Sequence, residues 1–359
     1  MTTPQVSLVC VPRERFSFAR ESLESLYANT DWPFRLMYVD NGAPGSLRRW
    51  LRAQSAVRGF ELVKAPHFLS PNQARNLGLA EARTQDAKYI VFVDNDVVFE
   101  TGWLERLVRC AEETGATVVG PLVCQHEPLH SIIHCAGGEF MPDADLLRFR
   151  LEPQPTLPVA GPGQQRWRIQ EKIYQQGEPV EACDREHRPT GFVEFHCVLV
   201  RRSFLDEHGP LDERFLTTKE YLDLAMTVAR AGGSVWLEPS ARVTFRTHFP
   251  APPLAFSDLP YFMLRWSDRW MIENLAYMRN KWDLVDDAYF QKRYRKLGWR
   301  RRIEILRPLG RHMPFLNETG SEWVTDRLAL AEKRLNRFVT DRHAARVGRA
   351  TADSGGMHA

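Results

Sequence analysis

The segment Tyr89-Ile90-Val91-Phe92-Val93-Asp94-Asn95-Asp96 joins an unbroken apolar run to two carboxylates spaced one residue apart. An apolar run of this length is typical of a strand buried inside a sheet. In open α/β sheets, ligands bind in the crevice outside the carboxyl ends of the strands, so Asp94 and Asp96 are predicted to face that crevice. Carboxylate oxygens are preferred ligands of Mg²⁺ and Mn²⁺, and an ion held there could neutralise a diphosphate.

The residues around this segment alternate between strand and helix patterns. Strands are predicted at residues 6–11, 35–40, 60–63, 88–93 and 117–123, and helices near 19–27, 47–53, 72–82 and 103–111. Such regular alternation implies a mainly parallel sheet with helices on both faces. We therefore expect an α/β fold, whose first half spans residues 1–125.

The alternation weakens in residues 126–250, the second half of the expected fold. Residues 140–190 are rich in Pro, Gln, Gly and charge, which is typical of a long loop or a lid-like insertion. A helix is predicted at 221–231, because Gly232 and Gly233 form a helix stop signal. Two short strands, 235–237 and 243–245, are predicted to follow it.

A proline-rich stretch at 250–253 predicts a domain boundary. Beyond it, residues 251–350 are expected to form a helical and basic extension, and residues 351–359 a disordered tail. The basic run 292–302 has seven cations interleaved with aromatic and apolar residues. Such a run is usually a solvated helix face, but it could also rest on anionic lipid as a peripheral membrane contact.

Composition limits the classes of protein to consider. The 359 residues are 43% hydrophobic, which supports a sizeable core, and a net charge of +3 does not indicate a nucleic-acid partner. The six cysteines form no CxxC pair, so we expect reduced core residues in a cytosolic protein. The amino terminus lacks a signal-peptide pattern, and no apolar stretch reaches the roughly 18 residues of a membrane span.

Several common motifs are absent or unsuitable. The chain has no GxGxxG and no GxxxxGK[ST], which argues against the dinucleotide fingerprint and the P-loop. His126-Glu127-Pro128-Leu129-His130 matches the HExxH pattern of zinc proteases. A proline between the two histidines disrupts the helical turn that such a site requires. We expect a polar loop at this position.

Four segments resemble, in order and spacing, the motifs of family 2 glycosyltransferases of the GT-A fold. They are residues 6–12, 38–42, 72–78 and 92–96. The resemblance extends to residues 220–224 and 230–232, and so covers about residues 5–250. It implies a metal-dependent, inverting transfer of a sugar from a nucleotide-diphosphate donor to an acceptor hydroxyl. It also implies that residues 1–125 form the nucleotide-sugar-binding half and residues 126–250 the acceptor-binding half.

The resemblance also assigns roles to individual residues. Asp96 is expected to ligate Mn²⁺ or Mg²⁺ directly, and Asp94 to bind the ribose or a metal-bound water. Asp40 could accept the N3 proton of a uracil or thymine ring, although it could equally cap the turn at Asn41-Gly42. The remaining donor contacts are expected from Val11, Pro12, Arg75, Asn76 and Asn95.

His248 lies where many relatives place a histidine ligand for the metal, but a lone histidine is more often structural or solvated. Glu194 and His196 lie in a segment that resembles the acceptor-side strand of the family. They are expected to contact a glycan, lipid-linked or small-molecule acceptor, although their position at a buried strand end would explain them nearly as well. We expect a cytoplasmic protein, with peripheral contact at the inner membrane face if the basic run binds lipid.

The catalytic base is the least certain assignment. Inverting transfer requires a carboxylate that removes the proton of the acceptor hydroxyl. The family supplies it from a Glu-Asp pair, but here the second acid is replaced by Tyr221. Glu220 is the first candidate and Asp223 the second, although Asp223 could simply complement the dipole at a helix N-terminus.

Two other classes of protein remain open. A non-catalytic nucleotide-sugar-binding protein would keep the donor site and lack the base, and the replacement at Tyr221 leaves room for it. A sugar-nucleotide pyrophosphorylase would need a glycine-rich loop after the first strand, and residues 11–15 do not provide one.

Overall fold

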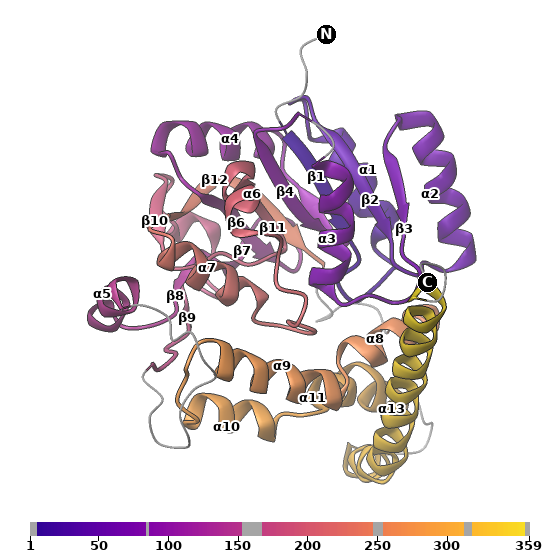
Figure 1. Cartoon of the computed structure of the whole chain (residues 1–359). Coiled ribbons are helices and arrows are strands. Elements are labelled where there is room, and N and C mark those ends of the chain that lie inside the picture. The colour runs from indigo at the N-terminus through magenta and orange to yellow at the C-terminus, as the bar shows by residue number, and fades with distance from the viewer. Residues whose placement is uncertain (1–5, 84–85, 153–166, 247–253, 312–317, 356–359) are drawn as a thin grey trace.

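A single mixed sheet organises the amino-terminal two thirds of the computed structural model, which describes residues 6–83, 86–152, 167–246, 254–311 and 318–355 (Figure 1). The sheet has ten strands, and its main path runs β10-β12-β6-β11-β4-β1-β2-β3. Helices cover it, and a separate group of helices follows at the carboxyl-terminal end of the chain. This arrangement confirms the predicted α/β fold with a helical extension.

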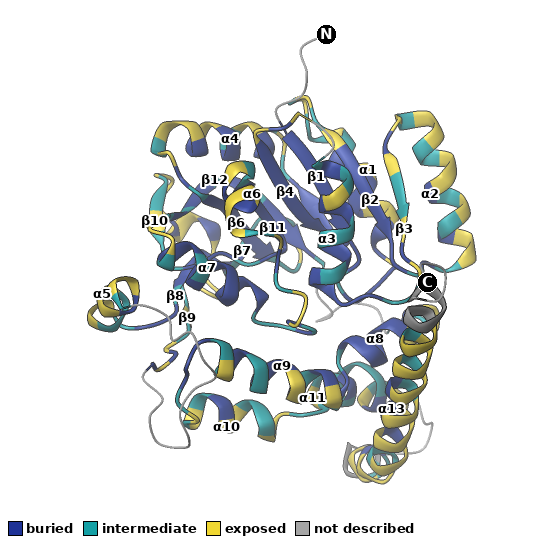
Figure 2. Ribbon diagram, viewed as in Figure 1, coloured by how far each residue is buried: buried dark blue, intermediate teal, exposed yellow. Residues whose placement is uncertain are grey.

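The first four strands of the sheet are parallel neighbours. They are β1 (Val6–Val11), β2 (Arg35–Asp40), β3 (Glu61–Lys64) and β4 (Tyr89–Asp94). The helices between them are α1 (Ala19–Ala28), α2 (Gly45–Arg58) and α3 (Pro71–Ala82). Every residue of β1 and β4 is buried, as expected for strands covered on both faces (Figure 2). The carboxyl ends of β2 and β4 carry Asp40 and Asp94 to one edge of the sheet.

Local sequence explains how α3 begins and why it lies close to the sheet. Ser70 and Gln73 form a capping box at its N-terminus, and Pro71 occupies the first turn. A Cβ atom at Gly78 would lie 2.4 Å from Cγ1 of Val9, so only glycine permits this close approach to β1. The helix therefore holds Arg75 against the strand ends.

The chain between residues 97 and 245 adds the remaining strands of this sheet and a separate two-stranded sheet of β8 and β9. It contributes β5 (Val97–Phe99), α4 (Trp103–Thr114), β6 (Val118–Gln125), β7 (Ile132–Cys135), β8 (Gly138–Glu139), β11 (Cys197–Arg201), α6 (Arg202–His208), α7 (Glu220–Arg230) and β12 (Val235–Phe245). Strand β11 lies antiparallel between β4 and β6. The two strands predicted at 235–237 and 243–245 are one strand, β12, with an irregularity between Glu238 and Arg242.

The segment 140–190 is not the long loop that its composition indicates. Its described part contains α5 (Asp143–Leu151), β9 (Lys172–Ile173), the 3₁₀ helix η1 (Val180–Ala182) and β10 (Arg188–Thr190). Strand β10 joins the main sheet through β12, and β9 pairs with β8. Pairing with distant strands, which local composition does not encode, supplies the order. Residues 153–166 lie outside the described ranges.

The residues that follow the sheet form the predicted helical extension. Its elements are α8 (Leu259–Arg265), α9 (Asp268–Lys281), α10 (Ala288–Arg295), α11 (Trp299–Arg301), η2 (Arg302–Leu306), α12 (Arg307–Arg311) and α13 (Glu318–Gly355). The tail predicted to be disordered from residue 351 is instead helical as far as Gly355. The proline-rich boundary at 250–253 falls outside the described residues.

The extension lies below the sheet in Figure 1, next to the loops that leave the carboxyl ends of the strands. Asp258 accepts hydrogen bonds from the Phe16 amide and the Ser17 hydroxyl, both at 2.9 Å. The loop after β1 is thus held by the extension as well as by the sheet. No helix in the described ranges is both long and apolar enough to cross a membrane.

Candidate active site

Asp94 and Asp96 lie together at the end of β4, each with an exposed fraction of 1%. Three backbone hydrogen bonds hold the turn that carries them. Asp94 N donates to His196 O at 3.0 Å, Asn95 N to Val11 O at 2.9 Å, and Arg246 N to Asp96 O at 2.7 Å. The two carboxylates are therefore fixed by neighbouring parts of the sheet.

The Asn95 side chain ties this turn to the loop after β1. Its Oδ1 accepts from the backbone N of Arg13 at 3.2 Å, and its Nδ2 donates to Arg15 O at 2.8 Å. The donor contact expected of Asn95 stays a prediction. In the structure its side chain positions residues 13–15.

Asp94 is surrounded by cationic and imidazole groups. Its carboxylate pairs with Arg75 Nη2 at 3.0 Å, with Arg13 Nε at 3.6 Å and with His196 Nδ1 at 3.5 Å. Burial raises the pKa of Asp94, and the two arginines oppose that rise. Arg13 was not predicted from the sequence. Its guanidinium also packs over the ring of Phe245, 5.2 Å from the centroid.

Asp96 has an unsatisfied oxygen. Its buried Oδ1 has no hydrogen-bond partner among the described residues. Burial raises the pKa of Asp96 to about 8, and Asp94 adds to the rise, while Arg13 opposes it. A buried carboxylate without a partner is costly, and a cation would remove that cost.

His196 completes a set of metal-ligand atoms with the two aspartates. One ligand atom from each of Asp94, Asp96 and His196 lies within 4.8 Å of the others. Burial lowers the pKa of His196 well below its usual value, and Arg13 adds to that effect. A neutral imidazole is the form that ligates metals, and the His196 Nδ1 atom has no hydrogen bond in the described residues. These residues therefore fit Mn²⁺ or Mg²⁺.

Glu194 and His134 support the far side of His196. Glu194 Oε2 lies 3.6 Å from His196 Nε2 and 2.8 Å from His134 Nε2. This places the two residues predicted to contact the acceptor, Glu194 and His196, beside Asp94. Their acceptor role stays a prediction. The other predicted metal ligand, His248, lies outside the described residues.

Glu220 begins helix α7 and shares Arg75 with Asp94. Its Oε1 lies 3.4 Å from Arg75 Nη1 and 3.9 Å from Nη2 of Arg265. Arg75, with an exposed fraction of 1%, also lies over the ring of Phe195. The arginine predicted to contact the nucleotide thus connects Asp94 and Glu220. Arg265 belongs to α8, and no local sequence motif predicted its contact with Glu220.

Asp223, one turn further along α7, faces different partners. Its Oδ1 lies 2.7 Å from Lys281 Nζ and accepts from Trp282 Nε1 at 2.7 Å. Burial raises the pKa of Asp223 to about 6, while Lys281 opposes the rise. Since both partners belong to the extension, Asp223 is a poorer candidate for the base than Glu220.

Tyr221, which replaces the second acid of the family pair, contacts a carboxylate from another part of the chain. Its hydroxyl donates to Glu171, which also binds Lys219 at 2.7 Å, Tyr289 at 2.9 Å and Arg293 at 2.7 Å. Burial alone would raise the pKa of Glu171, but Lys219, Tyr221 and Arg293 hold it at about 2. Glu171 is therefore an ionised carboxylate whose partners within the protein assign it a structural role.

The residues predicted to bind the nucleotide base lie at the ends of β1 and β2. Asp40 accepts hydrogen bonds from the Ala43 amide and from Arg48 Nε, both at 2.7 Å, so the turn-cap reading of this residue is confirmed. Val11 and Pro12 are buried, and Pro12 O accepts from Tyr261 of α8 at 3.4 Å. A donor contact from these three residues stays a prediction.

The Asn76 side chain binds the loop that contains Leu211 and Glu213. Its Nδ2 donates to Leu211 O at 2.7 Å and to Glu213 at 3.0 Å, and its Oδ1 accepts from Leu211 N at 3.0 Å. These bonds hold the loop that leads toward α7. The donor contact predicted for Asn76 is untested, and its amide is already fully engaged.

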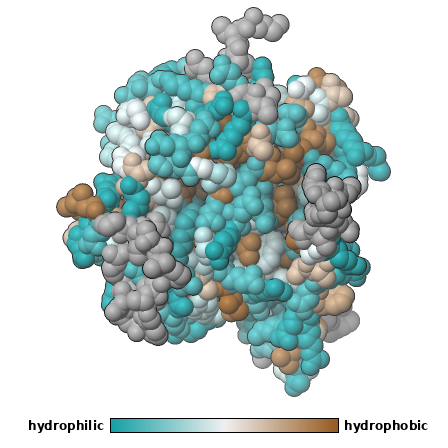
Figure 3. Space-filling model, viewed as in Figure 1, coloured by the Kyte–Doolittle hydropathy of each residue, from teal (hydrophilic) through white to brown (hydrophobic). Residues whose placement is uncertain are grey.

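The basic run 292–302 is largely paired within the protein. Arg293 binds Glu171, Arg300 binds Glu14, Arg301 binds Asp268 and Glu332, and Arg302 binds Asp326. Figure 3 shows a mainly hydrophilic surface over the visible part of the extension, with hydrophobic residues in small patches. Membrane contact stays a prediction.

A cavity of about 190 Å³ separates the start of α7 from the extension. Thr218 and Lys219, directly before Glu220, line one part of it, and Trp266, Lys296 and Trp299 line another. The wall of this cavity contains aromatic and cationic side chains, and it reaches the two residues that precede Glu220.

Comparison with known proteins identifies the amino-terminal part of the chain. Residues 8–133 match the family model described as "Glycosyl transferase family 2". These residues are a family 2 glycosyltransferase domain. Comparison with curated proteins gave no match.

Solved structures add a likeness of fold. A crystal structure of GalNAc-T7 with UDP, GalNAc and Mn²⁺ aligns with a TM-score of 0.51 at 14% identity, covering 87% of this chain and 58% of that one. This chain thus spans little more than half of that protein. Structures of S. aureus TarS 1–349 with UDP and with UDP-GlcNAc give TM-scores of 0.44, with 12% and 11% identity. Each covers 95% of this chain, and 91% and 92% of TarS. The alignment with the GalNAc-T7 structure is a likeness of fold, and it agrees with a GT-A fold for this chain.

Proposed function

We propose that this glycosyltransferase is metal-dependent and inverting, and that it moves a sugar from a nucleotide-diphosphate donor to an acceptor hydroxyl. One observation carries the proposal: Asp96 Oδ1 is buried without a partner beside Asp94 and a neutral His196. In a family 2 domain, such a set is suited to a divalent cation bound to the donor diphosphate. When bound, Mn²⁺ or Mg²⁺ would supply positive charge to the leaving diphosphate.

The residues of the chain would carry out the remaining steps. Arg13 and Arg75, next to Asp94, would orient the donor and balance its charge. Glu220 would accept the proton of the acceptor hydroxyl as that oxygen attacks the anomeric carbon. A single carboxylate acting as base leads to inversion, since no enzyme-bound sugar intermediate is formed.

We further propose that the acceptor is a glycan or another hydroxyl-bearing molecule that enters through the cavity beside Lys219. The rings of Trp266 and Trp299 in the cavity wall offer apolar faces to a sugar. A cytoplasmic location is supported by the six cysteines, all buried and free of disulfides.

A donor screen tests the proposal. The protein is incubated with Mn²⁺ and with UDP-, GDP-, ADP- and dTDP-sugars, and release or transfer of the sugar is measured. UDP-sugars come first, because the GalNAc-T7 structure, which has a similar fold, contains UDP. We expect turnover with one donor class that requires the metal, and a product of inverted anomeric configuration by NMR.

Two variants separate an enzyme from a binding protein. Glu220→Gln should abolish turnover and retain donor binding, while Glu207→Gln, on the exposed surface, should behave as wild type. If wild type binds a nucleotide sugar but is as inert as Glu220→Gln, the non-catalytic reading holds. Synthesis of a nucleotide sugar from a triphosphate would instead identify a pyrophosphorylase.

A further inference from the structure

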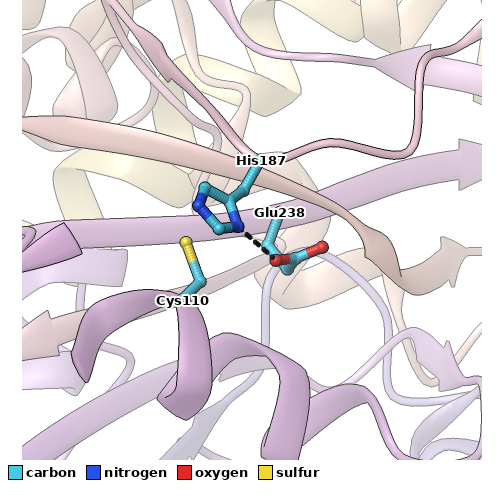
Figure 4. Close-up of side chains that lie close together, drawn as sticks. All are labelled: Cys110, His187 and Glu238. Atoms are coloured by element: carbon cyan, nitrogen blue, oxygen red, sulfur yellow. Dashed lines mark ion pairs between the residues drawn. The ribbon is translucent and has the colours of Figure 1, made fainter. Parts of the chain in front are cut away.

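A second group of metal-ligand side chains lies outside the candidate active site. Cys110 of α4, Glu238 of β12 and His187, which directly precedes β10, point toward one another (Figure 4). One ligand atom from each lies within 4.8 Å of the others. The three residues come from segments far apart in the chain, so their meeting results from the tertiary fold.

This cluster is separate from Asp94, Asp96 and His196 of the candidate active site. In the register of β12 with β6, Glu238 pairs with Pro121, whereas the crevice end of that pair is Phe245 with Gln125. Four residues of β6 therefore separate the two sites, about 13 Å at about 3.3 Å per residue. Figure 1 also shows α4 at the top of the view and the helical extension at the bottom.

The Glu238 carboxylate needs a positive partner. Its side chain has an exposed fraction of 8%, and its Oε1 accepts from the backbone N and the hydroxyl of Ser240. Its Oε2 faces His187 Nδ1 at 3.6 Å, and His187 is its only ion-pair partner within the described ranges. Burial of a carboxylate is costly unless a cation compensates it.

We propose that Cys110, His187 and Glu238 bind Zn²⁺. Thiolate, imidazole and carboxylate are all ligands of this borderline-soft ion, whereas the crevice offers mainly hard oxygen ligands. Around a tetrahedral Zn²⁺ with bonds of about 2.0 to 2.3 Å, ligand atoms lie about 3.3 to 3.8 Å apart. Side-chain movements of about 1 Å would bring the three atoms to that spacing.

The exposure of the site fits three protein ligands and a water. The His187 side chain is 34% exposed, so solvent can reach the fourth position, whereas Cys110 is 1% exposed. A bound ion would join the 140–190 segment, through His187, to the sheet and to α4. The bound ion would therefore stabilise the position of the edge strand β10, which follows His187 and pairs with β12.

Cobalt substitution tests the site directly. The full-length protein is stripped with EDTA and titrated with Co²⁺, whose bond to a thiolate gives an intense charge-transfer absorption in the near ultraviolet. We expect one equivalent of Co²⁺ to produce this band and one equivalent of Zn²⁺ to abolish it. Asp96→Asn should leave the titration unchanged, because it alters only the crevice.

Variants of the cluster identify the ligands. Cys110→Ser should lose the thiolate band and His187→Ala should weaken Co²⁺ binding at least tenfold. Cys183→Ser, in the same segment but outside the cluster, should match wild type. Since His187 is partly exposed, its variant should fold even if Cys110→Ser does not. Absence of the band in wild type, or its persistence in Cys110→Ser, would overturn the proposal.

Discussion

Two buried carboxylate sites flank Glu220, and they differ in how their charge is balanced. Glu171, reached through Lys219 and Tyr221, has two cations and two hydroxyls as partners, and its pKa is held at about 2. Asp96, reached through Arg75 and Asp94, has an oxygen without a partner, and burial raises its pKa to about 8. A carboxylate whose oxygens all have partners stabilises the fold, whereas one with an unpartnered oxygen is suited to a ligand.

The largest effect expected from this difference is the loss of activity in Asp96→Asn. We expect sugar transfer to fall by roughly 1,000-fold, because metal charge on the leaving group contributes several kcal/mol and each 1.4 kcal/mol is tenfold. Thermal stability should stay the same or rise, since a poorly compensated acid is removed. Asp31→Asn, on the surface, is the control for activity and melting temperature. A strongly destabilised Asp96→Asn would contradict the comparison.

The counterpart at the other site is Glu171→Gln, which should act on stability. Removing this carboxylate leaves Lys219 and Arg293 without their shared counter-charge, and we expect a loss of about 3 to 5 kcal/mol in the free energy of unfolding. Urea denaturation measures it, with the exposed Glu181→Gln as the control. A loss below about 1 kcal/mol would mean that the Glu171 cluster is not structural.

Asp223 is an intermediate case that pH can resolve. Its pKa is raised from 3.8 to about 6 in the folded state, so the protonated form is favoured by folding. Its contribution to stability is full below pH about 4 and is lost as pH rises through about 6, on the order of 3 kcal/mol. Asp223→Asn should lack this component of the pH profile of unfolding. Identical profiles for wild type and variant would refute the assignment.

Tyr221→Phe should give the smallest effect. It removes one hydrogen bond to Glu171, while Lys219, Tyr289 and Arg293 remain. We expect a loss of about 1 kcal/mol in stability and little change in the catalytic rate constant. A large fall in that rate constant with unchanged stability would instead place the tyrosine hydroxyl in catalysis.

The sequence predicted the parts of the site that local patterns encode. Apolar runs ended by polar residues located the strands that carry Asp40 and Asp94, and the pattern of residues 72–82 located the helix that carries Arg75. The single strand β12 was divided in two because an irregularity at residues 238–242 interrupts its pattern.

The missed residues are those whose roles depend on distant contacts. Arg265 reaches Glu220 from the helical extension, and Glu171 reaches Tyr221 from a segment that lacks periodicity. His196, whose acceptor role stays a prediction, lies against Asp94, a contact that no local pattern indicated. No local pattern specifies which residues from separate segments meet.

The central claim is that the unsatisfied oxygen of Asp96 is a metal ligand. Electron paramagnetic resonance of Mn²⁺ tests it most directly, because the signal of free Mn²⁺ falls when the ion binds. With UDP, GDP, ADP and dTDP added in turn, wild type should remove one equivalent of free Mn²⁺ per chain with at least one of them, and Asp96→Asn should remove none. Equal removal by wild type and Asp96→Asn would contradict the claim.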